Sequence, residues 1–122
     1  MNIEDFRKYC LSVKGSTESI SLQKRNVLVC KVMGKVFVYI LLEPEDGVFK
    51  AYLKCDPERS VELREKYNGI NPDDFKTLLW NWVTIESDVP DKLIEELIRH
   101  SADEVIRKLP KKKQEEYRLN NG

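Results

Sequence analysis

Hydrophobic residues recur at helical spacing from the start of the chain: Ile3, Phe6, Cys10 and Val13. This stripe predicts an amphipathic helix over residues 3–13, with Gly15 as its stop. The next hydrophobic runs, VLVCKV and KVFVYILL, are rich in β-branched and aromatic residues. They predict a hairpin whose two-residue turn is Gly34-Lys35.

The pattern after the hairpin predicts one more pair of strands and two helices. EPEDG at 43–47 has the composition of a turn, and a third strand is expected over 48–54. Asp56 and Pro57 then have the residue types of a helix cap and a first helical position. A loop, INPDDF, and a fourth strand, WNWVTIE at 80–86, follow.

The longest predicted helix starts at Pro90, and Pro110 ends it at Leu109. Its hydrophobic stripe consists of Leu93, Ile94, Leu97, Ile98, Val105 and Leu109. The resulting order, α–β–β–β–α–β–α with clustered strands, indicates an α+β protein with an antiparallel sheet of about four or more strands and its helices on one face. The length of 122 residues suits a single domain over 1–122, in which 111–122 form a basic C-terminal extension that frays at its end.

Composition indicates a soluble cytoplasmic protein. No hydrophobic run approaches the roughly 20 residues that span a bilayer, and the acidic, polar amino terminus does not resemble a signal peptide. Formal net charge is zero, yet six basic and two acidic residues give 107–118 a net charge of +4. Three widely spaced cysteines favour buried free thiols, with Cys10 in the first helical stripe and Cys30 inside a strand.

No catalytic or metal-binding motif is present in the sequence. The single histidine, His100, falls at the edge of its helix's hydrophobic stripe, which is typical of a surface or helix-flanking residue. Acidic residues cluster in turns: Glu43, Glu45, Asp46, Asp73 and Asp74. We therefore expect a protein that is not an enzyme and that uses no cofactor and no metal.

The third strand alternates in a way that indicates an open sheet face. Lys50, Tyr52 and Lys54 point away from the helices, and Trp82 of the fourth strand shares their face. Aromatic residues interleaved with lysines suit base stacking and phosphate neutralisation. The alternative is a half-solvated sheet face whose aromatic residues pair across strands.

The basic segment near the C-terminus also has two interpretations. Lys111, Lys112 and Lys113 are available to neutralise phosphates. However, basic residues are favoured at a helix C-terminus by its dipole, and Glu115 and Glu116 are spaced to pair with the first two lysines.

Three runs in the same order resemble the MmcQ/YjbR family: CLSVKGSTES, YLKCDPERSVELREKY and SDVPDKLIEELIRHSADEVIRKLPKKK. The resemblance implies a CyaY-like fold of the "double wing" type, which is often described as DNA-binding. The chain departs from the family where members carry Phe-x-Phe-Gly, here SISLQKRN, and Met-Asn-Lys-x-His-Trp, here FKTLLW with Leu79 in place of the histidine. The fold does not bring frataxin's acidic first helix with it, because Arg7 and Lys8 balance Glu4 and Asp5.

Two functions follow from these observations. The first is a monomeric domain that binds DNA weakly through the open face and the basic segment. Its candidate residues are Lys50, Tyr52, Lys54, Trp82, Lys108, Lys111, Lys112 and Lys113. The alternative is a protein- or small-ligand-interaction module in which Trp80, Trp82 and Tyr52 form an aromatic patch. Zero net charge argues against a dedicated duplex binder.

Overall fold

The structure, a computed structural model, describes residues 1–21, 23, 26–43, 49–75 and 77–121, which form four helices and a six-stranded antiparallel sheet. In chain order the elements are α1 (Ile3–Leu11), β1 (Ser16–Ile20), β2 (Val27–Val32), β3 (Lys35–Leu41), β4 (Lys50–Lys54), α2 (Pro57–Lys66), β5 (Ile70–Asn71), β6 (Trp80–Thr84), α3 (Asp91–Arg107) and α4 (Lys111–Asn121). The predicted α+β class with an antiparallel sheet is confirmed.

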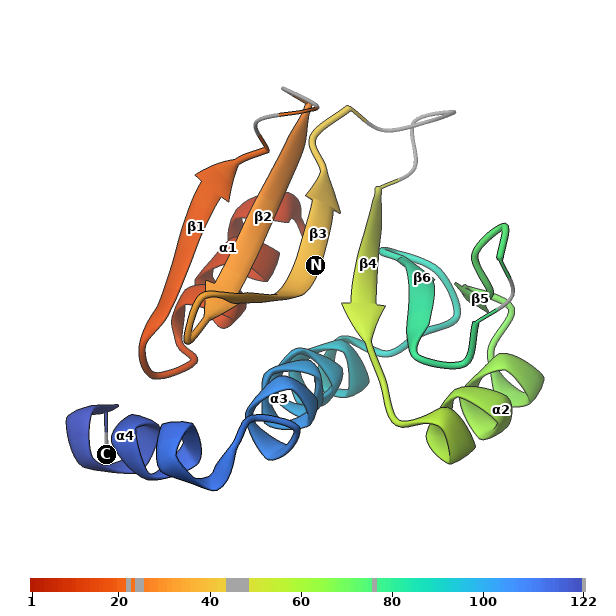
Figure 1. The fold of residues 1–122 in the computed structure, drawn as a ribbon. Helices are drawn as coiled ribbons and strands as arrows, with labels where there is room; N and C mark the ends of the chain where they lie inside the picture. The colour runs from red at the N-terminus through yellow and green to blue at the C-terminus, as the bar shows by residue number, and fades with distance from the viewer. Residues whose placement is uncertain (22, 24–25, 44–48, 76, 122) are drawn as a thin grey trace.

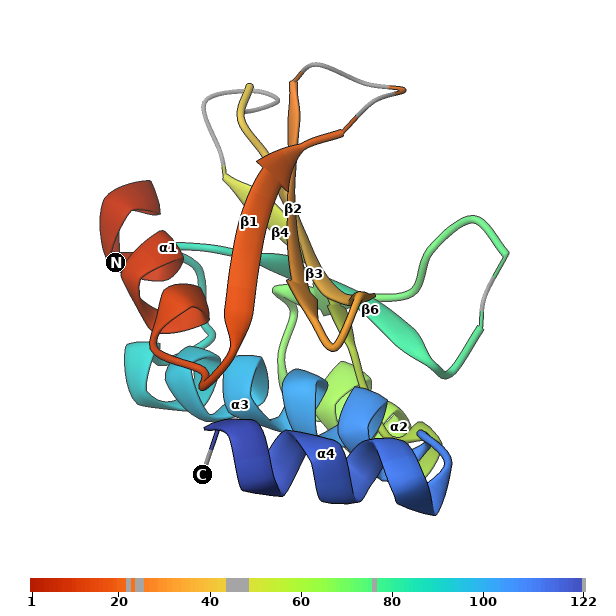
Figure 2. The same cartoon turned by 60° about the vertical axis from the view of Figure 1, so that its left-hand side comes forward.

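The strands lie in the order β1-β2-β3-β4-β6-β5, so β4 is central and pairs with β3 and β6. Helix α3 contacts β2, β3 and β4, whereas α1 packs against α3 and β1. Figure 1 shows α1 behind strands β1–β3 and no helix in front of them. Figure 2 shows the same sheet nearly edge-on, with α1 on one side and α3 beneath. One face of β2, β3 and β4 is therefore left without a helix.

The β2–β3 hairpin turns one residue earlier than the sequence predicted. Val32 pairs with Lys35, so the turn is Met33-Gly34, and Lys35 already belongs to β3. Both turn residues have positive φ, 52° and 75°, as a tight hairpin turn of type I′ requires. The prediction of Gly34-Lys35 was wrong because Met33 adopts the left-handed conformation that usually favours glycine.

A β-bulge interrupts the same hairpin. Cys30 pairs with Val38 but Lys31 pairs with Val36, which leaves Phe37 as the extra residue of β3. Phe37 and Val38 are both fully buried. The bulge thus adds a large aromatic side chain to the core at a position where strict alternation would turn it outward.

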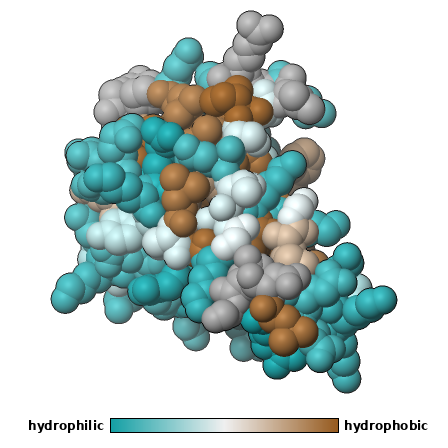
Figure 3. Space-filling view, turned by 90° about the vertical axis from the view of Figure 1, so that its left-hand side faces the viewer, coloured by the Kyte–Doolittle hydropathy of each residue, from teal (hydrophilic) through white to brown (hydrophobic). Residues whose placement is uncertain are grey.

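Strands β1 and β5 were missed. Strand β1 reads STESI, and its polar side chains suit an edge strand, where charge discourages further pairing. Glu18 of β1 accepts hydrogen bonds from the guanidinium of Arg7 in α1 at 2.5 and 3.3 Å. Figure 3 views the molecule from this side: the face is mostly hydrophilic, and its hydrophobic patches are separated by hydrophilic residues. Strand β5 has two residues, too few for a periodic signal.

The predicted helices are present, with changes at their ends. Helix α1 ends at Leu11 rather than at 13, because Ser12 caps it and donates its hydroxyl to the Tyr9 carbonyl. Asp56 caps α2 through the Arg59 amide, as predicted. Pro90 precedes α3, and Pro110 separates α3 from α4, a helix of 11 residues within the predicted C-terminal extension.

The predicted third and fourth strands are β4 and β6, each shorter than expected. Part of the first, together with residues 44–47 of the predicted turn and its Glu45 and Asp46, lies outside the described residues. Ala51 and Leu53 of β4 are buried and alternate with half-buried Lys50, Tyr52 and Lys54, as predicted. No helix in the described part of the chain is long and apolar enough to cross a membrane.

Cys10, Cys30 and Cys55 are free and buried, as expected for the first two. The pKa of the Cys10 thiol is raised well above its ordinary value, first by its hydrogen bond with Cys30 and then by burial. Burial also raises the pKa of the Cys55 thiol. Because the thiolate is the reactive form and all three thiols are buried, we expect them to react slowly in the folded chain.

We therefore predict that the folded protein reacts slowly with a chromogenic disulfide reagent at mildly alkaline pH, and that all three thiols react at once in denaturant. Stopped-flow absorbance measures both rates. Ser19→Cys, on the exposed edge strand, supplies the control and should add one fast thiol. Three fast thiols in the native protein would contradict the buried positions.

Candidate functional site

Four aromatic side chains from three adjacent strands form a row on the sheet face that no helix covers. They are Tyr39 of β3, Tyr52 of β4, and Trp80 and Trp82 of β6. Tyr52 lies at the centre, directly opposite Trp82 in the ladder, with ring centroids 4.7 Å apart. It also stacks on Trp80 at 5.0 Å and 15°, and Tyr39 closes the cluster at 6.0 Å from Tyr52 and 5.6 Å from Trp80. We call this set the aromatic row.

A lysine flanks each end of the aromatic row. Lys54 lies opposite Trp80 in the ladder, and its ammonium is 5.4 Å from that ring's centroid, within the range of a cation–π contact. Lys50 lies opposite Thr84 and lines a cavity of about 390 Å³ together with Trp82. The face therefore alternates positive charge and aromatic surface along β4.

Helix α2 fixes the position of Trp80 through a buried polar network. The Arg64 Nε donates to the Asn81 side-chain oxygen at 2.6 Å, and the Asn81 amide donates to the Ser60 hydroxyl at 2.9 Å. Arg64 also donates to the backbone carbonyls of Thr77 at 2.5 Å and Trp80 at 3.1 Å. Asn81 is buried on the core side of β6, so the neighbouring Trp80 is held toward the open face.

Tyr52 is anchored by the loop that precedes β6. Its hydroxyl donates to the carboxylate of Asp73, which also accepts from the Thr77 amide at 3.1 Å. Burial and this hydrogen bond raise the pKa of Tyr52 above its ordinary value. The central ring of the row is therefore neutral and held in one orientation near neutral pH.

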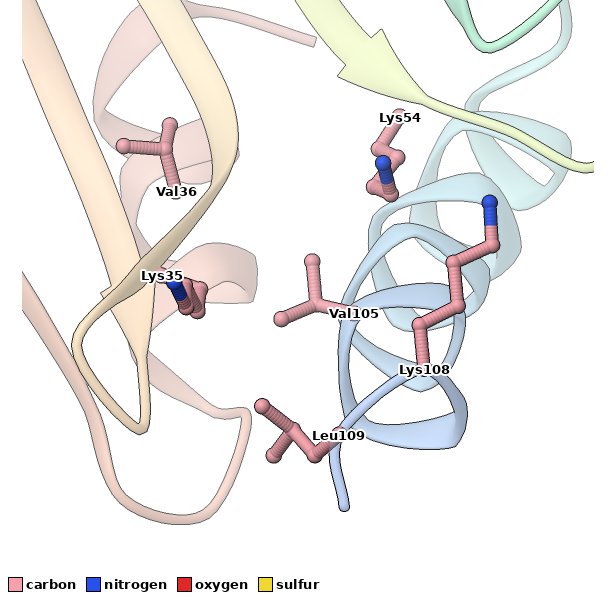
Figure 4. A pocket seen from close by; sticks show the side chains of 6 residues that line it. All are labelled: Lys35, Val36, Lys54, Val105, Lys108 and Leu109. Atoms are coloured by element: carbon pink, nitrogen blue, oxygen red, sulfur yellow. The ribbon is translucent and has the colours of Figure 1, made fainter.

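A second cavity, of about 220 Å³, opens at the Lys54 end of the face. It is lined by Lys35, Val36, Lys54, Val105, Lys108 and Leu109, from β3, β4 and the C-terminal end of α3. Figure 4 shows the Lys54 and Lys108 ammonium groups on one side, Lys35 on the other, and Val105 and Leu109 between them. Burial lowers the pKa of Lys54, and the positive charge of Lys108 lowers it further. We call this the lysine pocket.

The predicted site residues thus fall into three groups. Tyr52 and Trp82 contact each other in the aromatic row, and Lys50 lines the cavity beside Trp82 that also includes Asn71 of β5. Lys54 and Lys108 meet in the lysine pocket. The first turn of α4 exposes Lys111, Lys112 and Lys113. The ion pair found there joins Lys113 to Glu116 at 3.4 Å, three residues apart, instead of the expected pairs of Lys111 with Glu115 and Lys112 with Glu116.

Sequence reasoning left Tyr39, Lys35 and Asp73 out of the site. Tyr39 falls between the inward residues Val38 and Ile40, so alternation places it outward, but its contact with Tyr52 depends on the β3–β4 register. Lys35 belongs to the site because the hairpin turns one residue earlier than predicted. The bond from Tyr52 to Asp73 has no sequence signal.

The single histidine of the chain makes a structural contact. The His100 Nε2 accepts a hydrogen bond from the Asp56 amide at 3.1 Å, which ties α3 to the start of α2. Within the described ranges, no group of three or more His, Cys, Asp or Glu residues is arranged to hold a metal ion. The aromatic side chains of the open face can stack on planar groups, and its lysines can attract anions.

The fold and site define a class: an α+β domain whose open antiparallel face carries aromatic residues and lysines. Residues 11–103 match the YjbR family. The chain therefore belongs to that family, as its sequence resemblance indicated. Comparison with curated proteins gives no match.

Two solved structures share the fold. A Deinococcus radiodurans protein described as a DUF419 domain has 30% sequence identity and a TM-score of 0.81, with 94% of this chain and 86% of that chain covered. A Pseudomonas syringae protein has 22% identity and a TM-score of 0.69, with 84% of this chain and 97% of that chain covered. The second likeness concerns the fold alone.

One of the two departures from the family pattern lies beside the site, and the other begins at edge strand β1. Leu79, at the position of the family histidine, is 37% exposed next to Trp80. The segment that replaces Phe-x-Phe-Gly begins in edge strand β1 and includes residues 22, 24 and 25, which lie outside the described part.

Removing the Asn81 side chain should destabilise the fold. Asn81→Ala removes the acceptor of the Arg64 Nε and the donor to the Ser60 hydroxyl, which keeps its bond to the Leu78 carbonyl, and we expect a loss of about 2–4 kcal/mol in the free energy of unfolding. Urea titration followed by tryptophan fluorescence measures this loss. Asn71→Ala is the matched control, because its amide bonds only the Asn68 carbonyl at an exposed site, and it should cost less than about 1 kcal/mol. Equal losses in the two variants would contradict the role of the network.

The raised pKa of Tyr52 predicts a specific loss of stability in alkali. In the unfolded chain Tyr52 has its ordinary pKa of about 10, which is lower than its pKa in the folded chain. The neutral hydroxyl of Tyr52 therefore contributes its full stabilisation below about pH 10, and this contribution is lost as the pH rises further. Urea unfolding of the wild type and Tyr52→Phe from about pH 9 to about pH 11 tests this. The stability difference between them should shrink with pH, and a constant difference would refute it.

Proposed function

We propose that this chain binds single-stranded DNA weakly through its open sheet face. The supporting observation is the aromatic row, with Tyr52 and Trp80 stacked at 5.0 Å and a lysine at each end of β4. Aromatic surface accepts bases of any identity by stacking, and lysines neutralise the adjoining phosphates. The proposed contacts are therefore tolerant of sequence.

The geometry favours a single strand over a duplex. Bases in a duplex are stacked on each other and are not free to lie on aromatic rings. Duplex-binding domains generally carry a basic footprint with a pI above about 9, whereas this chain has zero formal net charge and a pI of about 6.6. Positive charge is instead local, at the face and on the exposed first turn of α4, where Lys111, Lys112 and Lys113 add long-range attraction.

We expect a fluorescein-labelled oligo(dT) to bind with a dissociation constant in the micromolar range at low salt, measured by fluorescence anisotropy. Two or three phosphate contacts should make log K fall against log salt with a slope of about −1.5 to −2. Trp82→Ala removes a stacking surface and should weaken binding by about 10-fold or more.

Phe75→Ala is the matched control for the loss of an aromatic side chain. Phe75 is 91% exposed and lies outside the aromatic row, so its removal should leave the affinity for DNA unchanged. The proposal fails if no binding is detected at low salt, or if Trp82→Ala binds as tightly as the wild type. Tighter binding to duplex than to single-stranded DNA would also refute the preference for a single strand.

A second candidate function, protein recognition, is favoured by one observation. The loop before β6 exposes Phe75, Leu78 and Leu79 at 91%, 40% and 37%, beside the aromatic row. Exposed hydrophobic residues of this kind mark protein-interaction surfaces. Under this alternative, Phe75→Ala abolishes binding of the protein partner, and high salt does not weaken that binding. DNA binding is expected to behave in the opposite way on both counts.

A further inference from the structure

The lysine pocket exists because strands β3 and β4 separate at one end. They pair only from Val38 to Ile40, so the first residues of β3 have their ladder partners on β2 alone. The C-terminal end of α3 lies under the opening, and Val105 and Leu109 form an apolar base for the cavity of about 220 Å³. At about 30 Å³ per water molecule, this is space for roughly seven waters.

The three lysines that line the pocket have no ion-pair partner in the described part of the chain. Its salt bridges involve neither Lys35, Lys54 nor Lys108. The acidic group that acts on Lys54 is Glu104, and Glu104 is held by the Arg107 guanidinium through two hydrogen bonds of 2.9 and 3.0 Å. Three lysine side chains therefore border an apolar cavity whose described lining includes no carboxylate.

We propose that the lysine pocket binds a phosphate monoester, either the phosphate of a mononucleotide or the terminal phosphate of a DNA strand. The site goes beyond the proposed function, because it needs no stacked base. If both proposals are correct, Lys54 connects the lysine pocket to the aromatic row, because it lines the pocket and contacts the Trp80 ring.

A phosphate monoester fits the pocket better than a carboxylate or an internal phosphodiester. Near neutral pH it carries a charge of about −1.5 to −2 and three strong acceptor oxygens, against a single charge for the other two groups. Three lysines supply matching charge and donors. The volume lies below the roughly 300 Å³ of pockets that enclose a whole drug-sized ligand, so it suits a group rather than an entire nucleotide. The apolar base lowers the local dielectric and strengthens the attraction.

Inorganic phosphate is the first probe. We expect the methyl resonances of Val36, Val105 and Leu109 to shift saturably when phosphate replaces chloride at constant ionic strength, with a dissociation constant on the order of 1 mM. Lys108→Gln should weaken this binding by about 10-fold, because one charge-assisted contact is lost. Lys92→Gln, an exposed lysine at the other end of α3, is the matched control and should bind as the wild type does.

The proposal is overturned if the exchange of chloride for phosphate gives no saturable shift of these methyl resonances. It is also overturned if Lys108→Gln binds phosphate as tightly as the wild type. Both variants are checked for an unchanged fold by their amide spectra. Because Lys108 is exposed, its replacement is not expected to unfold the chain.

Two further ligands distinguish the two sources of the phosphate, a mononucleotide and the end of a DNA strand. Thymidine monophosphate should bind more tightly than thymidine, and oligo(dT) with a terminal phosphate more tightly than the same strand with hydroxyl ends, both about 10-fold and both lost in Lys108→Gln. If the mononucleotide binds and neither strand does, the pocket is upheld and the proposed DNA function fails. If both strands bind equally and phosphate leaves the pocket unchanged, the DNA function is upheld and the pocket proposal fails.

Discussion

The two-residue alternation of strand β4 is the constraint on which both the core and the site depend. Because β4 is flanked by β3 and β6, its inward residues Ala51 and Leu53 must be apolar. The alternate residues Lys50, Tyr52 and Lys54 lie on the open face. A shift of one residue would bury two lysines and expose the core. The same register that makes the fold stable therefore sets Tyr52 against Trp82 and Lys54 against Trp80.

A second constraint acts at the edge of the β3–β4 ladder. The bulge at Phe37 places an additional large side chain in the core, and the strands no longer pair beyond that point. Such irregularities re-aim strands and often lie beside functional sites. Here the irregularity leaves a cavity over α3 rather than a sealed core, with Lys35 and Lys54 on its opposite sides.

Periodicity in the sequence was sufficient to predict the fold class, the outward face of β4 and the capped start of α2. It was insufficient for β1, whose polar side chains carry no hydrophobic signal, and for the hairpin turn, where Met33 takes a conformation its side chain disfavours. The site divides in the same way. Tyr52 and Trp82 were each predicted from the alternation of their own strand, β4 or β6. Tyr39 and Lys35 depend instead on how neighbouring strands are paired, which tertiary packing decides.

Zero net charge and local excess charge are compatible because several acidic residues of this chain are paired with arginines. Glu18, Glu96 and Glu104 are each paired with an arginine. The Glu18 pair joins β1 to α1, the Glu96 pair joins α3 to α2, and the Glu104 pair lies within α3. Lysines, by contrast, remain without carboxylate partners at the pocket, where an apolar base keeps water from screening them fully. Arginine thus serves the fold through planar, paired hydrogen bonds, while lysine is left as a mobile point charge. This division lets a chain of zero formal net charge carry a pocket lined by three lysines.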